Sequence, residues 1–128
     1  MRVVMSHEPL ISIVDDDESV RDAVQTLLES TGRRTVAFAS AEQFLASSAV
    51  CASDCLILDL CMPGIGGLEL QQRLRDAGSR IRIIMLTAHP SKVAHARALA
   101  AGVAAFFAKP FQPDVLLEAV EASLSQGS

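Results

Sequence analysis

The sequence predicts a doubly wound α/β fold, in which a parallel five-stranded sheet carries helices on both of its faces. Two observations lead to this prediction. Five apolar runs of strand length alternate along the chain with segments of helical periodicity, which is the pattern of consecutive βα units. These runs are nearly continuous in apolar residues, as is typical of strands buried on both faces. We therefore expect a (βα)5 arrangement with right-handed crossovers.

The first βα unit starts with the apolar run at residues 10–14, which ends in an acidic segment. Apolar side chains then recur at i, i+3, i+4, i+7 and i+8, which predicts an amphipathic helix: Val20, Ala23, Val24, Leu27 and Leu28. We assign Asp17 to the N-cap of this helix and Gly32 to the left-handed position after its end. A weaker strand is expected around residues 35–38, and Ser40 to Gln43 form the pattern of a capping box for a short helix.

Three further apolar runs, at residues 55–58, 83–86 and 104–108, predict the remaining strands. A loop rich in proline and glycine separates the first of them from a third helix, whose apolar stripe is Leu70, Leu74 and Ala77. Pro90 suits position N1 of a fourth, alanine-rich helix, and Pro113 opens a last helix.

Length and composition limit what the chain does. Its 128 residues are enough for one domain with a packed core, which we expect at residues 9–124, between short flexible tails at 1–8 and 125–128. A net charge of −4 argues against direct binding of nucleic acid. The three cysteines show no C-x-x-C spacing and the three histidines include no pair at i, i+4, so we expect neither a disulfide framework nor a zinc site.

The sequence contains no pattern of a membrane span or a secretion signal. The longest apolar stretch, residues 98–108, is interrupted by Gly102 and is too short to cross a bilayer. Arg2 is followed by only three apolar residues before Ser6, which does not make a signal peptide. We therefore expect a cytoplasmic protein without a membrane partner.

The most informative feature is the polar side chain at the end of four of the five predicted strands. Asp15 and Asp16 follow the first strand, and the third, fourth and fifth end at Asp59, Thr87 and Lys109. In an open parallel sheet, ligands bind outside the carboxyl ends of the strands, where the strand order reverses. Clustered carboxylates repel one another unless a cation neutralises them, and Mg²⁺ prefers such oxygen ligands. With a lysine and a hydroxyl to contact phosphoryl oxygens, the set predicts a site for Mg²⁺ and a phosphoryl group.

Each of these residues also has a simpler explanation when it is taken alone. The acidic segment after the first strand could be a solvated helix N-terminus, and Asp59 a turn aspartate. Thr87 alone fits a strand end, and Lys109 alone fits a surface lysine whose stem packs on apolar side chains. The coincidence of suitable groups at four strand ends favours the functional interpretation.

Four motifs, in this order, resemble those of response-regulator receiver domains, the CheY-like family. They are Ile13-Val14-Asp15-Asp16-Asp17, Leu58-Asp59-Leu60-Cys61-Met62-Pro63-Gly64, Leu86-Thr87-Ala88 and Ala108-Lys109-Pro110-Phe111. The segments Glu69 to Arg73 and Thr87-Ala88-His89 further resemble the FixJ-like subgroup. The resemblance covers the chain from about Pro9 to Leu124, and it implies a flavodoxin-like fold with the strand order 2-1-3-4-5.

The resemblance implies a role for each residue of the expected site. Asp59 is expected to accept a phosphoryl group from a phosphohistidine on a sensor histidine kinase. The carboxylates of Asp16 and Asp59 and the backbone carbonyl of Cys61 are expected to bind Mg²⁺, and Asp15 is expected to act through a bound water. Lys109, oriented by a cis peptide bond to the following proline, is expected to pair with a phosphoryl oxygen.

The resemblance also implies a switch and its partners. Thr87 is expected to move towards the phosphoryl group, and Phe106 to turn inward into the space that Thr87 leaves. The face made by the fourth helix, fifth strand and fifth helix is expected to control a fused or separate output domain, and to form a phosphorylation-dependent homodimer. Apart from Mg²⁺-assisted self-phosphorylation and slow self-dephosphorylation, no enzymatic activity is expected.

Two other functions remain open at this point. A Mg²⁺-dependent phosphatase of the haloacid-dehalogenase type also uses a strand-end aspartate as nucleophile. That family needs a second aspartate two positions later, where this chain has Cys61, and it leaves the acidic pair after the first strand unexplained. A receiver-like domain that only scaffolds its partners is the second alternative, which the complete acidic set disfavours.

Overall fold

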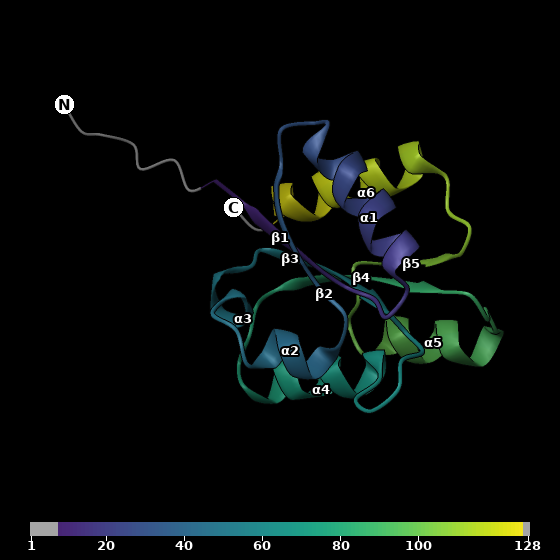
Figure 1. Ribbon diagram of the computed structural model, residues 1–128. Helices are drawn as coiled ribbons and strands as arrows, with labels where there is room; N and C mark the ends of the chain where they lie inside the picture. The colour runs from purple at the N-terminus through teal and green to yellow at the C-terminus, as the bar shows by residue number, and fades with distance from the viewer. Residues whose placement is uncertain (1–7, 127–128) are drawn as a thin grey trace.

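Five parallel strands form one sheet in the computed structural model of the protein, which describes residues 8–126 (Figure 1). The strands are β1 (Leu10–Val14), β2 (Arg34–Phe38), β3 (Cys55–Asp59), β4 (Arg82–Thr87) and β5 (Ala105–Ala108). They lie in the order β2-β1-β3-β4-β5, and every neighbouring pair is parallel. The expected strand order and doubly wound topology are therefore confirmed.

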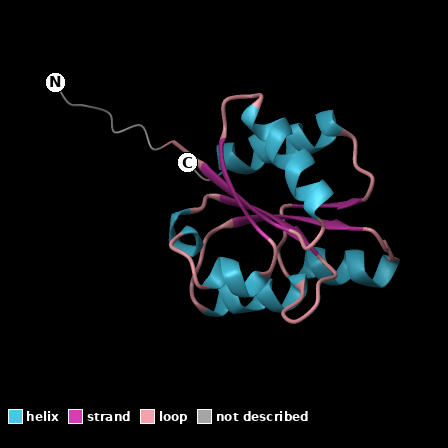
Figure 2. Ribbon diagram, viewed as in Figure 1, coloured by secondary structure: helices cyan, strands magenta, loops and turns pink. Residues whose placement is uncertain are grey.

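Helices lie on both faces of this sheet, as Figure 2 shows. On one face are α1 (Glu18–Glu29) and α6 (Pro113–Gln126). On the other face are α2 (Ala41–Leu45), α3 (Ala49–Ala52), α4 (Gly67–Asp76) and α5 (Lys92–Ala100). None of the helices between residues 8 and 126 combines the length and the apolar character that a membrane span requires.

The core consists of two apolar layers, one on each side of the sheet. Successive side chains of a strand point to opposite faces, so neighbouring residues divide between the two layers. In β3, Leu56 and Leu58 pack in the layer that includes side chains of α2, α4 and α5, whereas Ile57 packs with side chains of α1 and α6. Because strands buried in this way need apolar side chains on both faces, the sequence shows unbroken apolar runs.

The strand order reverses next to β1. Strand β2 lies on one side of β1, whereas β3, β4 and β5 follow in turn on the other side. The connections that leave β1 and β3 therefore run to opposite faces, which opens a crevice at the carboxyl ends of these two strands. Asp15 follows β1 and Asp59 ends β3, so the fold places both of these acidic residues at the crevice.

The region between β2 and β3 differs from the prediction. It forms two short helices, α2 and α3, so the described chain has six helices instead of the expected five. The Ser47 hydroxyl lies between them, where it donates to the Phe44 carbonyl and accepts from the Ala49 N–H. A serine side chain that bonds nearby backbone groups in this way competes with helix continuation, so the segment is divided at this point.

The start of α5 and the end of α6 also differ from the prediction. Pro90 is not at position N1, because Ser91 caps α5 and its hydroxyl accepts from the Ala94 N–H at 3.0 Å. The serine supplies a cap hydrogen bond that proline cannot make. Helix α6 continues to Gln126, beyond the expected domain limit at residue 124. Most of the expected tails, at residues 1–7 and 127–128, lie outside the described residues.

The two predicted helix caps are confirmed, with a change in one detail. Asp17 caps α1 and accepts from the Ser19 N–H at 2.9 Å. Ser40 caps α2 and accepts from the Gln43 N–H at 3.1 Å. The Gln43 side chain accepts in turn from the Ala39 N–H instead of the Ser40 N–H, so the second bond of the capping box forms one residue earlier.

Gly67 marks a close approach of α4 to the end of β3. A Cβ atom at this position would lie 2.7 Å from the Asp59 carbonyl oxygen and 2.9 Å from the Leu60 Cα, both of them backbone atoms. The Gly67 N–H also donates to the Leu60 carbonyl at 2.9 Å. Only glycine leaves room for this contact, which fixes the loop after Asp59 against the first turn of α4.

We predict that Gly67→Ala lowers the free energy of unfolding by about 1–3 kcal/mol, because the added methyl group must displace backbone atoms. Gly66→Ala is the matched control, since its Cβ would lie 3.5 Å from the Leu60 carbonyl oxygen, an ordinary contact. We expect a smaller loss for the control. Urea unfolding followed by far-ultraviolet circular dichroism measures both, and equal losses would contradict the close approach.

Candidate functional site

The carboxyl ends of β1, β3 and β5 bring three charged side chains into contact. Lys109 Nζ lies 2.8 Å from Asp15 Oδ2 and 3.5 Å from Asp59 Oδ1. The exposed fractions of these side chains are 14% for Lys109, 2% for Asp15 and 5% for Asp59. The ion pairs are therefore largely shielded from solvent. Charges in such a buried setting interact more strongly than charges at the surface.

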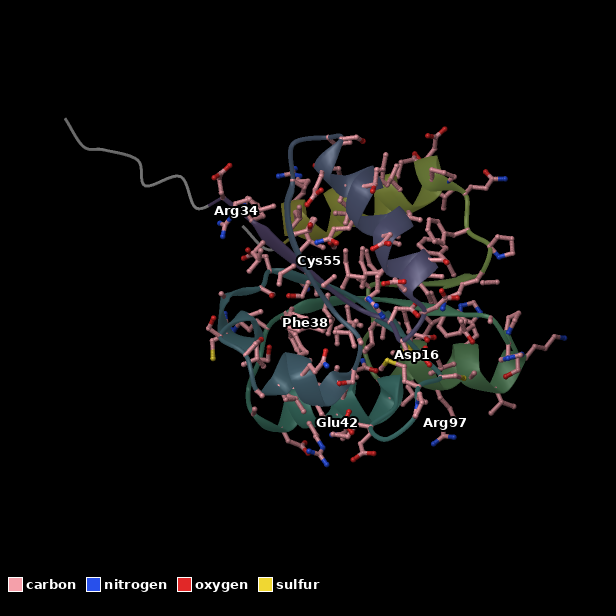
Figure 3. All side chains as sticks on the ribbon, viewed as in Figure 1. Asp16, Arg34, Phe38, Glu42, Cys55 and Arg97 are labelled. Carbon is pink, nitrogen blue, oxygen red and sulfur yellow. The ribbon has the colours of Figure 1, made fainter. Side chains whose placement is uncertain are left out.

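Asp16 completes an acidic cluster with the two buried carboxylates. One carboxylate oxygen from each of Asp15, Asp16 and Asp59 lies within 4.8 Å of the other two. Asp16 is exposed, so the cluster is open to solvent on its side, close to the ends of the central strands (Figure 3). A set of carboxylate oxygens suits a hard divalent cation such as Mg²⁺ rather than a transition metal.

Asp15 is held in place by contacts on three sides. Its Oδ1 atom accepts from the Asp17 N–H at 2.9 Å, and its backbone carbonyl accepts from the Arg21 guanidinium at 2.8 Å. Its Oδ2 atom is buried and forms an ion pair with the Lys109 ammonium at 2.8 Å. Both carboxylate oxygens are therefore engaged, and the side chain has a fixed orientation.

The electrostatic balance of the cluster is seen at Asp59. Its pKa is raised to about 7, first by burial and then by the charge of Asp15. Lys109 and the Cys61 N–H, which donates to Asp59 Oδ1 at 3.3 Å, lower the pKa but do not offset the other two effects. A cation bound at these oxygens would favour the charged form of Asp59.

Lys109 keeps its charge in this setting. Burial lowers the pKa of Lys109, but the contacts with Asp15 and Asp59 outweigh burial, so the pKa is raised overall. The Lys109 N–H donates to the Thr87 carbonyl at 2.7 Å, and the peptide bond from Lys109 to Pro110 is cis, as expected. The ammonium group is therefore a permanent positive charge beside the two buried acids.

Thr87 ends β4, the strand between those that carry Asp59 and Lys109. Its side chain is buried, and its hydroxyl accepts from the His89 N–H at 3.0 Å. In the register of the sheet, Asp59 is paired with Leu86, the residue before Thr87. The hydroxyl therefore belongs to the same edge of the sheet as the acidic cluster.

Phe106 lies on β5, where it is paired with Met85 of β4. Its half-buried ring stacks on the imidazole of His95, which projects from α5. The structure thus gives this residue a partner that the sequence did not suggest.

Arg21, which contacts the backbone of Asp15, was also missed by the sequence analysis. In the sequence it is one arginine among several, and the first turn of α1 brings it back to the strand end.

A large apolar groove adjoins the acidic cluster. It has a volume of about 1040 Å³ and runs along α1, where Val20 and Ala23 line it. Its other wall is the segment after β5, with Lys109, Pro110 and Phe111. The groove thus leads from the surface of α1 to the lysine of the site.

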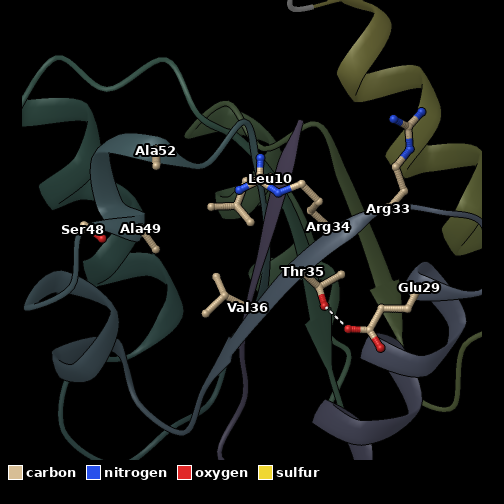
Figure 4. A pocket seen from close by; sticks show the side chains of 9 residues that line it. All are labelled: Leu10, Glu29, Arg33, Arg34, Thr35, Val36, Ser48, Ala49 and Ala52. Atoms are coloured by element: carbon tan, nitrogen blue, oxygen red, sulfur yellow. Dashed lines mark hydrogen bonds between the residues drawn. The ribbon is translucent and has the colours of Figure 1, made fainter. Parts of the chain in front are cut away.

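The pocket in Figure 4 lies at the opposite end of the sheet, where β1 and β2 begin. Its volume is about 560 Å³, and its charged side chains already have partners. The Thr35 hydroxyl donates to Glu29 Oε2 at 3.0 Å, and Arg33 pairs with Glu121 of α6. The chemistry expected from the sequence is therefore concentrated at the carboxyl ends of the strands.

Comparison with known proteins agrees with this geometry. A family model described as the response regulator receiver domain matches residues 11–121. The chain is 40% identical over 117 residues to the response regulator protein TmoT of Ectopseudomonas mendocina, which covers 91% of this chain and 53% of that protein. It is 35% identical over 118 residues to the transcriptional regulatory protein FixJ of Azorhizobium caulinodans, which covers 92% of this chain and 56% of that protein.

A solved structure shows the same arrangement of elements. The response regulator StyR superposes with a TM-score of 0.84 at 39% sequence identity, and the match covers 94% of this chain and 61% of that one. The chain spans little more than half the length of the relatives TmoT and FixJ. From the family match, the relatives and the shared fold, the chain belongs to the response regulator receiver domains of two-component signalling, with FixJ among its homologues.

Proposed function

We propose that this receiver domain accepts a phosphoryl group on Asp59 from a phosphohistidine of a sensor histidine kinase, in a Mg²⁺-dependent reaction. The observation that carries the proposal is the acidic cluster: Asp15, Asp16 and Asp59 lie within 4.8 Å of one another, with Lys109 2.8 Å from Asp15. Such a cluster is costly unless it serves to bind charged ligands. The functional unit in this proposal is residues 9–124, acting in the cytoplasm.

The donor set of the cluster fits Mg²⁺. The carboxylates of Asp16 and Asp59 and the backbone carbonyl of Cys61 would hold the ion, and Asp15 would contact it through a water. Bound there, Mg²⁺ would neutralise the carboxylates and the oxygens of the phosphoryl donor. The exposed carboxylate of Asp16, which has an oxygen within 4.8 Å of oxygens of Asp15 and Asp59, supports this assignment, because it leaves the cluster open to a cation from solvent.

Asp59 would be the nucleophile. One of its carboxylate oxygens bonds to phosphorus while the phosphorus–nitrogen bond of the donor imidazole breaks, which leaves an acyl phosphate on Asp59. Phosphoryl transfer has a loose transition state, so catalysis depends on positioning and on charge neutralisation. Lys109 Nζ lies 3.5 Å from Asp59 Oδ1, close enough to pair with an oxygen of the incoming group. The Thr87 hydroxyl would donate to another oxygen of that group.

The groove along α1 is the surface that we assign to the kinase. It is apolar along α1 and ends at Lys109 and Pro110, so a partner seated in it would lie next to the acidic cluster. A phosphohistidine must approach Asp59 from a neighbouring surface, since Asp59 itself is almost fully buried. The proposal includes no contact of this domain with nucleic acid or a membrane.

The output surface in the proposal is formed by α5, β5 and α6, the face expected from the sequence. Exposed apolar side chains lie on its two helices: Val93 is 68% exposed, Leu99 50% and Val115 39%. Such side chains favour association with another surface. We propose that phosphorylation, through Thr87 and Phe106, makes this face form a homodimer or control a fused or separate output domain. The chain acts as a switch, with self-phosphorylation and slow self-dephosphorylation as its only chemistry.

The phosphatase alternative has little support. It requires an acid two positions after the nucleophile, where Cys61 instead donates its N–H to Asp59. The family assignment also accounts for the acidic pair after β1, which the phosphatase does not.

We predict a single covalent phosphoryl adduct when the protein is incubated with acetyl phosphate and Mg²⁺, and none in Asp59→Asn or without the metal. Intact-mass spectrometry measures the adduct. Asp17→Asn is the matched control, because asparagine also caps a helix and Asp17 is outside the acidic cluster. The control should keep the adduct, and an adduct that persists in Asp59→Asn would place the phosphoryl group elsewhere.

The raised pKa of Asp59 leads to a second prediction, which concerns the free energy of unfolding of the metal-free protein. The folded-state pKa is about 7 against an ordinary 3.8, so the folded chain binds this proton more tightly than the unfolded chain does. The resulting stabilisation is present below about pH 4 and is lost as the pH rises through about 7. Asp59→Asn should therefore stabilise the metal-free protein at about pH 8 by about 1–3 kcal/mol more than it does at about pH 4.

Urea unfolding in the presence of a chelator, followed by circular dichroism at both pH values, measures this difference. Added Mg²⁺ should stabilise the wild type and leave Asp59→Asn nearly unchanged, which serves as the control. A gap between wild type and variant that does not widen with pH would show that Asp59 titrates normally.

We predict that Val93→Glu prevents the dimer that forms on phosphorylation while the covalent adduct is kept, because a charge would be buried in an apolar contact. Sedimentation velocity with acetyl phosphate and Mg²⁺ measures the dimer. Ala46→Glu, an exposed position at the end of α2 on the side of the sheet order opposite β5, is the control and should still dimerise. Dimerisation of Val93→Glu at the wild-type concentration would exclude α5 from the contact.

A further inference from the structure

Helix α5 is held to the sheet by few buried side chains. Among its residues only Ala98 is buried, whereas Val93 and Leu99 are mostly exposed. An element with so little buried apolar surface is weakly anchored, so each of its remaining contacts strongly affects its position. The contact of His95 with Phe106 is one of these, and it joins α5 to β5.

His95 lies flat on the ring of Phe106. The two ring centroids are 4.9 Å apart and the ring planes differ by 13°, which is a stacked arrangement. His95 is exposed and Phe106 is half-buried, so the imidazole covers part of the phenylalanine ring. A cavity of about 490 Å³ lies beside the pair, between Lys92 and Ala108, and gives the rings space to separate.

We infer that His95 is a positioning residue that holds Phe106 against α5 until Asp59 is phosphorylated. The inference rests on the proposed function, in which Phe106 turns inward as Thr87 moves towards the phosphoryl group. In this inference the ring leaves its stack on His95 when it turns into the space beside Thr87. The stack therefore stabilises the unphosphorylated arrangement and opposes the switch.

The effect of His95 reaches Asp59 by linkage. A contact that stabilises one of two conformations weakens the binding of every ligand that favours the other conformation. The loss of affinity is related to the stabilisation by that contact. Removal of the imidazole should therefore tighten the binding of a phosphoryl mimic at Asp59, although the mimic does not touch His95. The strength of an aromatic pair corresponds to about a two- to tenfold change in the equilibrium constant.

The test measures the apparent affinity of beryllofluoride, a phosphoryl mimic, for the full chain at saturating Mg²⁺. We expect His95→Ala to bind it about two- to tenfold more tightly than the wild type does. His95→Phe keeps a ring that can stack and should restore the wild-type affinity. Arg97→Ala removes another long, exposed side chain from α5 and should leave the affinity unchanged.

Nuclear magnetic resonance of the Phe106 ring protons gives a second readout, in the absence of the mimic. The ring-current shift from the imidazole should disappear in His95→Ala, and the resonances should move towards those of the beryllofluoride state. A merely structural role for His95 would lower stability without tightening the binding of the mimic.

The inference is overturned by an unchanged affinity in His95→Ala, or by equal tightening in His95→Ala and His95→Phe. A different result would contradict the proposed function. In that result beryllofluoride does not bind the wild type, or it binds Asp59→Asn as well as the wild type.

Discussion

The repulsion between two buried carboxylates is the constraint on which the rest of the site depends. Asp15 follows β1 and Asp59 ends the neighbouring strand β3, and the close-packed layers above and below the sheet leave these strand ends little freedom to separate. Burial and then the charge of Asp15 raise the pKa of Asp59 to about 7, and Lys109 offsets only part of this increase. The Asp17 N–H and the Arg21 guanidinium orient Asp15, whose Oδ2 atom pairs with Lys109. The fold thus creates a site that favours the binding of positive charge, and this site is open to solvent beside Asp16.

The same strand ends explain how far the sequence could be interpreted. The apolar runs that became β3 and β4 are buried on both faces, so their type, their direction and the polar residues that end them were all visible in the chain. The helices were less certain because their limits depend on individual side-chain hydrogen bonds. The Ser47 hydroxyl divides α2 from α3, and the Ser91 hydroxyl moves the start of α5 past Pro90.

Contacts between elements were beyond the reach of sequence patterns. His95 belongs to a helix with almost no amphipathic pattern, so nothing in the chain indicated which of its faces meets the sheet. Its partner Phe106 could be assigned to a strand but not to a neighbour, because the stacking of two rings depends on how α5 sits over β5. Gly67 stands at the end of the segment expected to be a loop rich in proline and glycine, whereas the structure makes it the first residue of α4, close to the Asp59 carbonyl. Tertiary contacts were therefore predictable where the strand order imposes them, as at the acidic cluster, and not where they depend on how a helix packs on the sheet.

The small buried surface of α5 has a consequence for which positions of the domain can be replaced. A helix with one buried residue contributes little to the hydrophobic core, so replacements along most of its length cost little stability. Strands β1 and β3, which lead to the acidic cluster, do not tolerate such replacements, because nearly all of their side chains are buried. The exposed surface of α5 can consequently change its side chains without disturbing the packing around Asp15 and Asp59, so the surface offered to a partner and the acidic site can vary independently.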